Sequence, residues 1–403
     1  MTAKILKGIT NLGQWVSWNP STHKMEIGEG GTWIFEDGLL AEYRSQTYQD
    51  SDFLDARRQL LTPGLIDPHT HPAFAATREL EFELRSQGKT YQEIAASGGG
   101  IRNSVRKLRE ISEKDLSILI TDRLSMMLAH GTTTVECKSG YGLSTESELK
   151  SLRAIRSASD QSAIQTFSTF LGAHEVPDEY RLDRDAYIHL LIHEMIPLVA
   201  EQKLADFCDV FCEEGVYSAT ETKRILQAAK SHGLKLKFHA DEFVSSGGAE
   251  LAAQLGALSA DHLMAITDEG IQALAASDTV ATLLPGTTFF LGSRSWAPAR
   301  KLIDAGVTVA LASDFNPGSN MGFSMPFMMT LAVIYLAMTP LEALQAATVS
   351  AAQSLGIADK RGAIAPGFQA DLVLWNTDNY RKLAYFYGIN QVSSVIVKSL
   401  HII

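Results

Sequence analysis

Two histidines separated by one residue end the apolar segment LLTPGLIDPHTH at residues 60–71. Side chains of a β-strand alternate between its two faces, so His69 and His71 would project from the same face and offer two imidazoles to one metal ion. On a helix the two side chains would diverge by roughly 200°. The apolar residues before them predict a buried strand whose carboxyl end opens into a site. An isolated pair of this kind is also typical of solvated histidines, so further ligands must come from elsewhere in the chain.

Two later segments supply the missing candidates. The segment KFHADE places His239 at the end of another apolar run, with Glu242 three residues further on, and LASDFNPG places Asp314 at the end of a third run. Three imidazoles and one carboxylate are a donor set that binds a single transition-metal ion. The sequence therefore predicts a metal site formed by His69, His71, His239 and Asp314.

These residues need a scaffold that brings distant segments together. Between residues 61 and 364, apolar strand-like runs alternate with amphipathic helical stretches. Eight strands are predicted, at residues 64–71, 132–138, 164–174, 208–213, 234–239, 257–262, 280–284 and 307–314, with helices that include residues 146–159, 184–203, 219–232 and 340–355. Eight such βα units indicate an α/β fold of the (β/α)₈ TIM-barrel type, whose active site lies at the carboxyl ends of the strands. The metal ligands would then come from strands one, five and eight.

The two ends of the chain predict a second, smaller unit. Residues 1–60 contain short strand-like segments, and Asp37-Gly38 between two of them is a hairpin signal. Residues 365–403 contain two further strand-like segments, at 370–375 and 392–398. Neither end is expected to hold a core alone. We therefore expect one small β-sandwich domain built from both termini, with the barrel of residues 61–364 inserted between them.

The composition narrows the class of protein. A formal net charge of −11 at pH 7 argues against unspecific nucleic-acid binding. Cys137, Cys208 and Cys212 are an odd number of cysteines without CxxC spacing, which predicts buried thiols in a reducing compartment. The N-terminus has no long apolar leader, and the apolar stretch at 327–338 is too short to span a bilayer and predicts a buried helix. We expect a cytoplasmic protein without nucleic-acid or membrane partners.

Four motifs extend the metal pattern: ECKSGYGL at residues 136–143, FLGAHEVP at 170–177, FHADEF at 238–243 and SDFNPGS at 313–319. With the predicted ligands, they resemble the imidazolonepropionase family of the amidohydrolase superfamily. The resemblance implies hydrolysis of the ring C–N bond of 4-imidazolone-5-propanoate to N-formimino-L-glutamate in histidine degradation, with one Zn²⁺ or Fe³⁺ ion per chain. It implies catalytic roles in proton transfer for Glu242 and His262. The implied substrate contacts are Arg78, Tyr141, His174, Glu242, Asn316, Gly318 and Ser319.

The residue types agree with this chemistry. A bound metal ion lowers the pKa of water toward neutrality and so provides a nucleophile for the ring carbonyl. Glu242 could carry the proton to the leaving ring nitrogen, and His174 and His262 could polarise the carbonyl oxygen or stabilise the alkoxide. Arg78, just after the first strand, suits the propionate of a small-molecule substrate because a guanidinium pairs bidentately with a carboxylate.

Other functions stay open at this point. An aminohydrolase that deaminates a nucleobase-like ring uses the same ligand set, although it would not need Arg78. A catalytically inactive barrel that serves as an interaction protein should have lost ligands, and all of them are present. Dinuclear relatives carry a bridging lysine on strand four, where this chain has Phe211-Cys212-Glu213, so one metal ion is favoured and Glu213 is the alternative bridge to a second.

Three smaller features complete the predictions. The segment SGGG at 97–100 indicates a lid loop rather than a phosphate cradle, because it lacks the lysine of a P-loop. His189 and His193 are spaced four apart on a predicted helix without a third ligand and are expected to be helix-surface or packing residues. Lys138 lies near the end of the second strand, where Tyr141 carries the stronger family signal. The oligomeric state stays open between a monomer and a homodimer.

Overall fold

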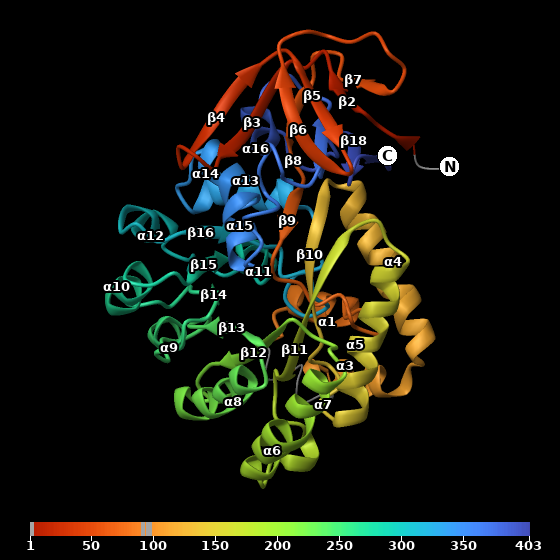
Figure 1. Ribbon diagram of the computed structural model, residues 1–403. Helices are drawn as coiled ribbons and strands as arrows, with labels where there is room; N and C mark the ends of the chain where they lie inside the picture. Colours follow the sequence, from red (N-terminus) through yellow and green to blue (C-terminus); the bar gives the residue numbers. More distant parts are fainter. Residues whose placement is uncertain (1–3, 90–92, 94–98) are drawn as a thin grey trace.

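The computed structural model describes residues 4–89, 93 and 99–403. At its centre, eight parallel strands follow one another in chain order, β9 to β16, around a barrel (Figure 1). These strands are β9 (Leu65–Asp67), β10 (Thr132–Lys138), β11 (Gln165–Ala173), β12 (Phe207–Cys212), β13 (Lys235–Ala240), β14 (Ser259–His262), β15 (Val280–Leu283) and β16 (Val309–Leu311). Each overlaps a predicted strand, so the prediction of a (β/α)₈ barrel is confirmed.

The barrel closes just beyond the ends of its first and last strands. β9 is shorter than predicted and ends at Asp67, ahead of Pro68, which has no N–H to donate to a neighbour. Past this point the two segments pair again, since the Asp314 N–H donates to the His69 carbonyl (3.0 Å) and the His71 N–H to the Phe315 carbonyl (2.9 Å). The closure therefore lies where the predicted metal ligands are.

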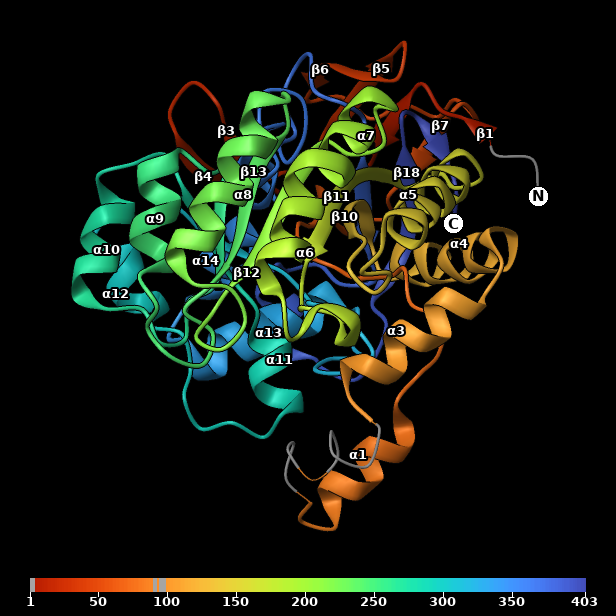
Figure 2. The same ribbon diagram turned by 90° about the horizontal axis from the view of Figure 1, so that it is seen from below.

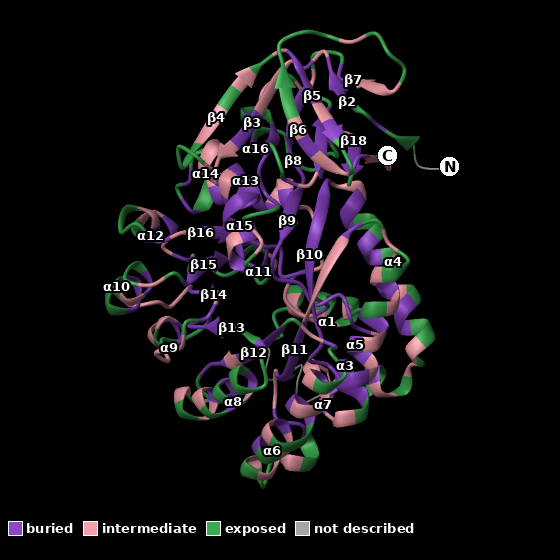
Figure 3. Ribbon diagram, in the orientation of Figure 1, coloured by how far each residue is buried: buried purple, intermediate pink, exposed green. Residues whose placement is uncertain are grey.

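Helices cover the outside of the barrel (Figures 1 and 2). Figure 3 shows exposed residues on the outer faces of the helices and buried residues on the strands inside. All seven residues of β10, for example, are buried. The helices are α1 (Glu79–Ser86), α3 (Ile101–Glu110), α4 (Glu113–Ala129), α5 (Thr145–Asp160), α6 (Arg184–Leu190), α7 (Ile196–Glu201), α8 (Ala219–Ser231), α9 (Gly248–Leu255), α10 (Asp268–Ala275), α11 (Pro285–Phe290), α12 (Ala299–Asp304), α13 (Met325–Tyr335), α14 (Pro340–Ala346), α15 (Val349–Ser354) and α16 (Arg381–Tyr385).

Two predicted helices are interrupted. Between α6 and α7 the segment Leu191–Met195 forms a turn of π-helix, just before Pro197, whose nitrogen has no hydrogen for the bond to residue 193. The predicted helix at 340–355 divides into α14 and α15 at residues 347–348. The apolar stretch at 327–338 forms most of α13, and in the described part of the chain no helix is both long and apolar enough to cross a bilayer.

Strands from both ends of the chain form two further sheets, at the top of Figure 1. The larger has the order β1-β19-β18-β17-β8-β3-β4 and the smaller β6-β5-β2-β7. Their strands are β1 (Lys4–Ile5), β2 (Gly8–Thr10), β3 (Gln14–Asn19), β4 (Lys24–Glu29), β5 (Thr32–Glu36), β6 (Leu39–Arg44), β7 (Phe53–Asp55), β8 (Leu60–Pro63), β17 (Leu372–Trp375), β18 (Val392–Val397) and β19 (Leu400–His401).

The two sheets enclose one apolar cluster. Ile9 and Trp33 from the smaller sheet share it with Leu61 and Leu374 from the larger one, which is the arrangement of a sandwich. The predicted hairpin at Asp37-Gly38 joins β5 to β6. The prediction of a small β-sandwich from both termini, beside the barrel, is therefore confirmed, whereas the exact division into domains stays a prediction.

Candidate metal centre and active site

The four predicted metal ligands meet at the carboxyl ends of the barrel strands. Nε2 of His69 lies 3.3 Å from Nε2 of His71, and the Asp314 carboxylate lies 3.6 and 3.4 Å from these two nitrogens. The rings of His69 and His239 are 4.5 Å apart between centroids. The ligand atoms of His69, His71 and Asp314 lie within 4.8 Å of one another, as do those of His69, His239 and His262.

Buried carboxylates orient two of these imidazoles. Asp261 lies 2.6 Å from Nδ1 of His69, and Asp209 lies 3.0 Å from Nδ1 of His239. A carboxylate at Nδ1 places the proton on that nitrogen and leaves the Nε2 lone pair free for a metal ion. Asp209 also accepts the backbone N–H of His239 through its other oxygen, at 3.1 Å. Both rings are therefore held with their donor atoms directed at the centre.

Two fully buried lysines support the carboxylates. Lys138 lies 2.7 Å from Asp209 and 2.6 Å from Glu136, and none of the three side chains is exposed. Burial alone would lower the pKa of Lys138, but Asp209 and Glu136 raise it above its usual value. Lys237 lies 3.7 Å from Asp261. Lys138 is therefore a buried, charged counter-ion of the carboxylates beneath the predicted metal ligands.

The arrangement fits a metal ion. Burial lowers the pKa of His71 to about 3 and that of His239 to about 4, so both imidazoles are neutral donors at pH 7. Their lone pairs converge with the Asp314 carboxylate in a place that solvent barely reaches, since each of these three side chains is at most 4% exposed. Lone pairs so crowded and buried are stabilised by a cation among them. Thr287 donates to Asp314 (2.5 Å) and fixes the carboxylate.

Glu242 and His262 lie beside this centre. Oε2 of Glu242 is 3.6 Å from Nε2 of His262, and neither side chain is more than 7% exposed. Burial, together with the charges of Asp314 and Glu213, holds the pKa of Glu242 well above its usual value. Burial lowers the pKa of His262 to about 3. A carboxyl group whose pKa is raised above its usual value is suited to accept a proton and to return it.

Glu213 builds the loop that carries Glu242. Its two carboxylate oxygens accept the backbone N–H groups of Glu242 (2.9 Å), Phe243 (3.3 Å) and Val244 (2.9 Å). With both oxygens engaged in this way, Glu213 has a structural task, and its geometry does not support the alternative of a bridge to a second metal ion.

Tyr141 and His174 lie next to the predicted ligands. The ring of His174 stacks on that of His71 with centroids 5.2 Å apart, and the ring of Tyr141 is 5.3 Å from that of His174. Nδ1 of His174 is 2.9 Å from the Gly140 carbonyl, to which it donates, so Nε2 is the acceptor. The carboxylate of Glu148 accepts the backbone N–H groups of residues 140, 142 and 143 and so holds the loop of Tyr141.

Arg78 lies against the loop that follows Asp314. A β-carbon at position 318 would lie 2.5 Å from Nη1 of Arg78, so the guanidinium would have to shift to admit a side chain there. Asn316 shapes the same loop: its side-chain oxygen accepts the N–H groups of Gly318 and Ser319, both at 2.8 Å, and its amide donates to Ser319 (2.6 Å). The structure therefore brings all predicted substrate contacts to the same end of the barrel. Their roles stay predictions.

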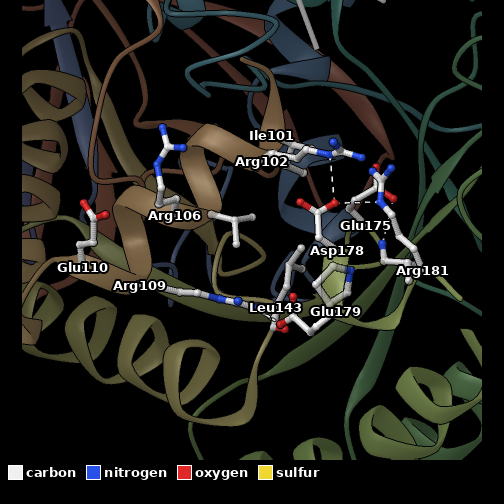
Figure 4. A pocket seen from close by; sticks show the side chains of 13 residues that line it. Ile101, Arg102, Arg106, Arg109, Glu110, Leu143, Glu175, Asp178, Glu179 and Arg181 are labelled. Carbon is white, nitrogen blue, oxygen red and sulfur yellow. Dashed lines mark hydrogen bonds and ion pairs between the residues drawn. The ribbon is translucent and has the colours of Figure 1, made fainter. Parts of the chain in front are cut away.

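A separate hollow of about 270 Å³ adjoins the loops of Tyr141 and His174 (Figure 4). Leu143 and Glu175, which follow those residues, line it together with side chains of α3. Arg109 of α3 donates to the carbonyls of residues 142 and 143 and pairs with Glu179 (2.7 Å). The charges around the hollow are largely paired with one another, and it lies outside the predicted metal centre.

Other sequence predictions have mixed outcomes. His189 and His193 are both exposed on the surface of α6 and the following π-turn, as predicted, with ring centroids 4.2 Å apart. The three cysteines are buried and free, also as predicted. The proposed lid SGGG falls partly outside the described residues, since 97 and 98 are not described.

Comparison with known proteins identifies the family. A model of the amidohydrolase family matches residues 60–400. The chain is 48% identical over 378 residues to an imidazolonepropionase of Geobacillus thermodenitrificans, covering 92% of this chain and 89% of the relative. It is 49% identical over 352 residues to an imidazolonepropionase of Symbiobacterium thermophilum, covering 87% and 83%.

Solved structures support the fold. A 5-methylcytosine deaminase from Klebsiella pneumoniae liganded with 5-fluorocytosine superimposes with a TM-score of 0.75 at 17% identity, over 97% of both chains. Atrazine chlorohydrolase TrzN from Arthrobacter aurescens TC1 complexed with zinc has a TM-score of 0.70 at 16% identity, over 98% of this chain and 95% of the other. At these identities the likeness concerns the fold alone. The sequence relatives decide the family: the chain belongs to the amidohydrolase family and, within it, to the imidazolonepropionases.

Proposed function

We propose that this protein hydrolyses the ring C–N bond of 4-imidazolone-5-propanoate to give N-formimino-L-glutamate, the ring-opening step of histidine degradation. One observation carries the proposal: a buried centre of three histidines and Asp314 lies beside the pair Glu242 and His262, and Arg78 adjoins the loop that leaves this centre. The buried centre with Glu242 and His262 suits hydrolysis of an amide-like bond. The arginine suits the charged tail of the substrate.

We propose further that His69, His71, His239 and Asp314 hold one Zn²⁺ or Fe³⁺ ion per chain. Three neutral imidazoles and one carboxylate are a donor set that such ions accept. When bound, the ion supplies Lewis-acid chemistry and lowers the pKa of water toward neutrality.

The side chains move the proton. Glu242 accepts a proton from the attacking water at its carboxylate, and the water oxygen forms a bond to the ring carbonyl carbon. The same carboxyl group then returns the proton to the ring nitrogen as the C–N bond breaks. The former carbonyl becomes the α-carboxyl group of the product, and the departing nitrogen becomes the end of its formimino group. His262 and His174, both neutral because burial lowers the pKa of each to about 3, can orient the oxygen of the substrate without adding charge.

Arg78 provides recognition of the propionate. A protein of net charge −11 needs a local cation to hold an anionic substrate, and the Arg78 side chain is only 9% exposed. Its pairing with a carboxylate is therefore shielded from bulk water and contributes more than a surface ion pair. Tyr141, His174, Asn316, Gly318 and Ser319 complete the proposed contacts.

The test is a ring-opening assay on purified metal-loaded enzyme with imidazolone propionate and with its neutral propionamide analogue. Arg78→Met should lower kcat/KM for the propionate by about 30- to 1000-fold, because it leaves a desolvated carboxylate without its partner. The same variant should leave turnover of the amide nearly unchanged. Arg106→Met, on the exposed face of α3, is the matched control and should behave as the wild type.

Absence of N-formimino-glutamate as a product of the wild type would refute the proposed function. Equal losses on both substrates in Arg78→Met would place propionate recognition elsewhere. Release of ammonia from a nucleobase-like ring, without ring opening, would instead support the aminohydrolase alternative.

A further inference from the structure

Arg78 is held by a neighbouring acid. Nε and Nη2 of Arg78 donate to the same carboxylate oxygen of Glu81, at 2.8 and 2.6 Å. The two side chains are 9% and 13% exposed, so solvent screens this pair far less than a surface pair. Glu81 lies three residues further along the chain, in the first turn of α1, the helix that stands out from the body of the molecule in Figure 2.

The contact with Glu81 occupies one edge of the Arg78 guanidinium and leaves a second edge that Glu81 does not contact. A guanidinium has five N–H groups in a rigid plane, and Nε with Nη2 forms its side edge. The end edge consists of Nη1 and the second hydrogen of Nη2. Nη1 is the atom that approaches Gly318, and among the described residues no hydrogen bond from it is found. The edge that can pair bidentately with a carboxylate therefore faces the loop of Asn316 and Ser319.

A second contact fixes Glu81 itself. Its other carboxylate oxygen accepts the backbone N–H of Gly100, at 2.9 Å. Gly100 is the residue before the first turn of α3, so Glu81 joins the start of α1 to the start of α3. A carboxylate held at both oxygens cannot follow the arginine if that side chain moves. Arg78 is therefore fixed in one orientation, although a free arginine samples many rotamers.

We infer that Glu81 is a positioning residue for substrate recognition: it occupies the side edge of Arg78 and so presents the end edge to the propionate. This inference rests on the proposed function. Two opposite effects of Glu81 have to be compared. Its negative charge weakens the attraction between Arg78 and an anion, whereas its hydrogen bonds remove the entropy loss of ordering the arginine on binding. The inference requires that ordering outweighs the opposing charge.

The sign of one measurement separates the two effects. Glu81→Gln keeps the size of the side chain but removes the charge and weakens the hold on Arg78. If Glu81 positions Arg78, this variant should raise KM for imidazolone propionate by about three- to tenfold, the usual cost of ordering one long side chain. kcat should change less than twofold, and KM for the neutral propionamide analogue should not change. Glu83→Gln, an exposed acid on the same helix, is the matched control.

A double variant tests whether Glu81 acts through Arg78. In the Arg78→Met background, Glu81→Gln should cause no further rise in KM, because the arginine it positions is gone. Thermal unfolding and metal content of each variant should match those of its parent. These two measurements show that the variants are folded and loaded.

Several outcomes would overturn the inference while the proposed function stands. A lower or unchanged KM for the propionate in Glu81→Gln would mean that the acid only competes for Arg78. An equal rise in KM for both substrates, or an additive rise in the double variant, would mean that Glu81 supports the fold through Gly100. A wild type that opens no imidazolone ring would instead refute the proposed function, and the inference with it.

Discussion

Replacement of Lys138 by methionine removes a buried cation from beneath the predicted metal centre. The change nearly preserves side-chain volume and leaves the carboxylates of Glu136 and Asp209 without their partner. In the folded protein Nζ of Lys138 lies 2.6 and 2.7 Å from these carboxylates, and all three side chains are fully buried. No water can take the place of the ammonium without repacking of the barrel interior.

The expected cost follows from this geometry. Loss of one partner of a buried ion pair typically costs about 3–5 kcal/mol, because an uncompensated charge remains in a medium of low dielectric constant. Thr169 also donates to Glu136, and the backbone N–H of His239 also donates to Asp209, so each carboxylate keeps one hydrogen bond when the ammonium is lost. We expect the free energy of unfolding to fall by about 3–4 kcal/mol. Since Asp209 orients His239, we also expect zinc affinity to fall by about 10- to 100-fold.

Urea-induced unfolding of the zinc-loaded protein and competition for zinc with a chelator measure the two effects. Lys301→Met is the control, because Lys301 forms an ion pair with Asp268 at the surface and its removal should cost less than about 1 kcal/mol. Adding Glu136→Gln to Lys138→Met should recover part of the lost stability, since one uncompensated charge is then removed.

The reasoning would be refuted if Lys138→Met unfolded within about 1 kcal/mol of the wild type and kept its affinity for zinc. Such a result would mean that Glu136 and Asp209 share a proton, so that the site does not need the ammonium charge. Loss of stability with unchanged zinc affinity would separate the two roles and assign Lys138 to the fold alone.

Three other predictions concern the site as a whole. Chelation should abolish turnover while the barrel stays folded by circular dichroism, and about one equivalent of zinc or iron per chain should restore it; two tightly bound ions per chain would contradict the single-ion site. Glu242→Gln should lower kcat by about 10²- to 10⁴-fold with metal content unchanged; loss of metal would make Glu242 a ligand. The metal-free protein should lose stability as pH falls, because burial lowers the pKa of His71, His174 and His262 from the ordinary 6.5 to about 3. Between these two pH values protons bind these histidines only in the unfolded chain and so favour unfolding. Urea unfolding at pH 7 and pH 5 should differ by about 2 kcal/mol for each such histidine, and equal stabilities would contradict the neutral, buried state of His71, His174 and His262.

The convergence of the four predicted metal ligands was predictable because of where these residues stand along the chain. His69, His71, His239 and Asp314 each lie at or just after an apolar strand, and parallel strands of a barrel have their carboxyl ends on one side. The alternation of strands and helices was therefore enough to bring four distant positions together. The pairing of both termini in one β-sandwich was also predictable, because neither end holds enough apolar residues for a core.

Other parts of the site have no such signal. Asp261 and Asp209 lie in the barrel strands among apolar neighbours, and Glu148, Glu213 and Glu81 stand where acidic residues are common on helices and loops. Among these acids, only Asp261 could have been singled out from the sequence, because it directly precedes His262 at the end of a predicted strand. Its position did not indicate which residue it would contact. The partner of Asp261 is His69, 192 residues away.

The sequence by itself determined the barrel through its hydrophobic periodicity and the family through four motifs, and residue types at strand ends were enough to predict a set of metal ligands. Only the tertiary structure decided which carboxylates orient His69 and His239, that Lys138 is a buried counter-ion, and that Glu213 accepts the backbone N–H groups of the loop that carries Glu242. The physical reason is that charges and hydrogen bonds act over a few ångströms. Which groups come that close depends on strand register and side-chain packing, and neither leaves a periodic pattern in the chain.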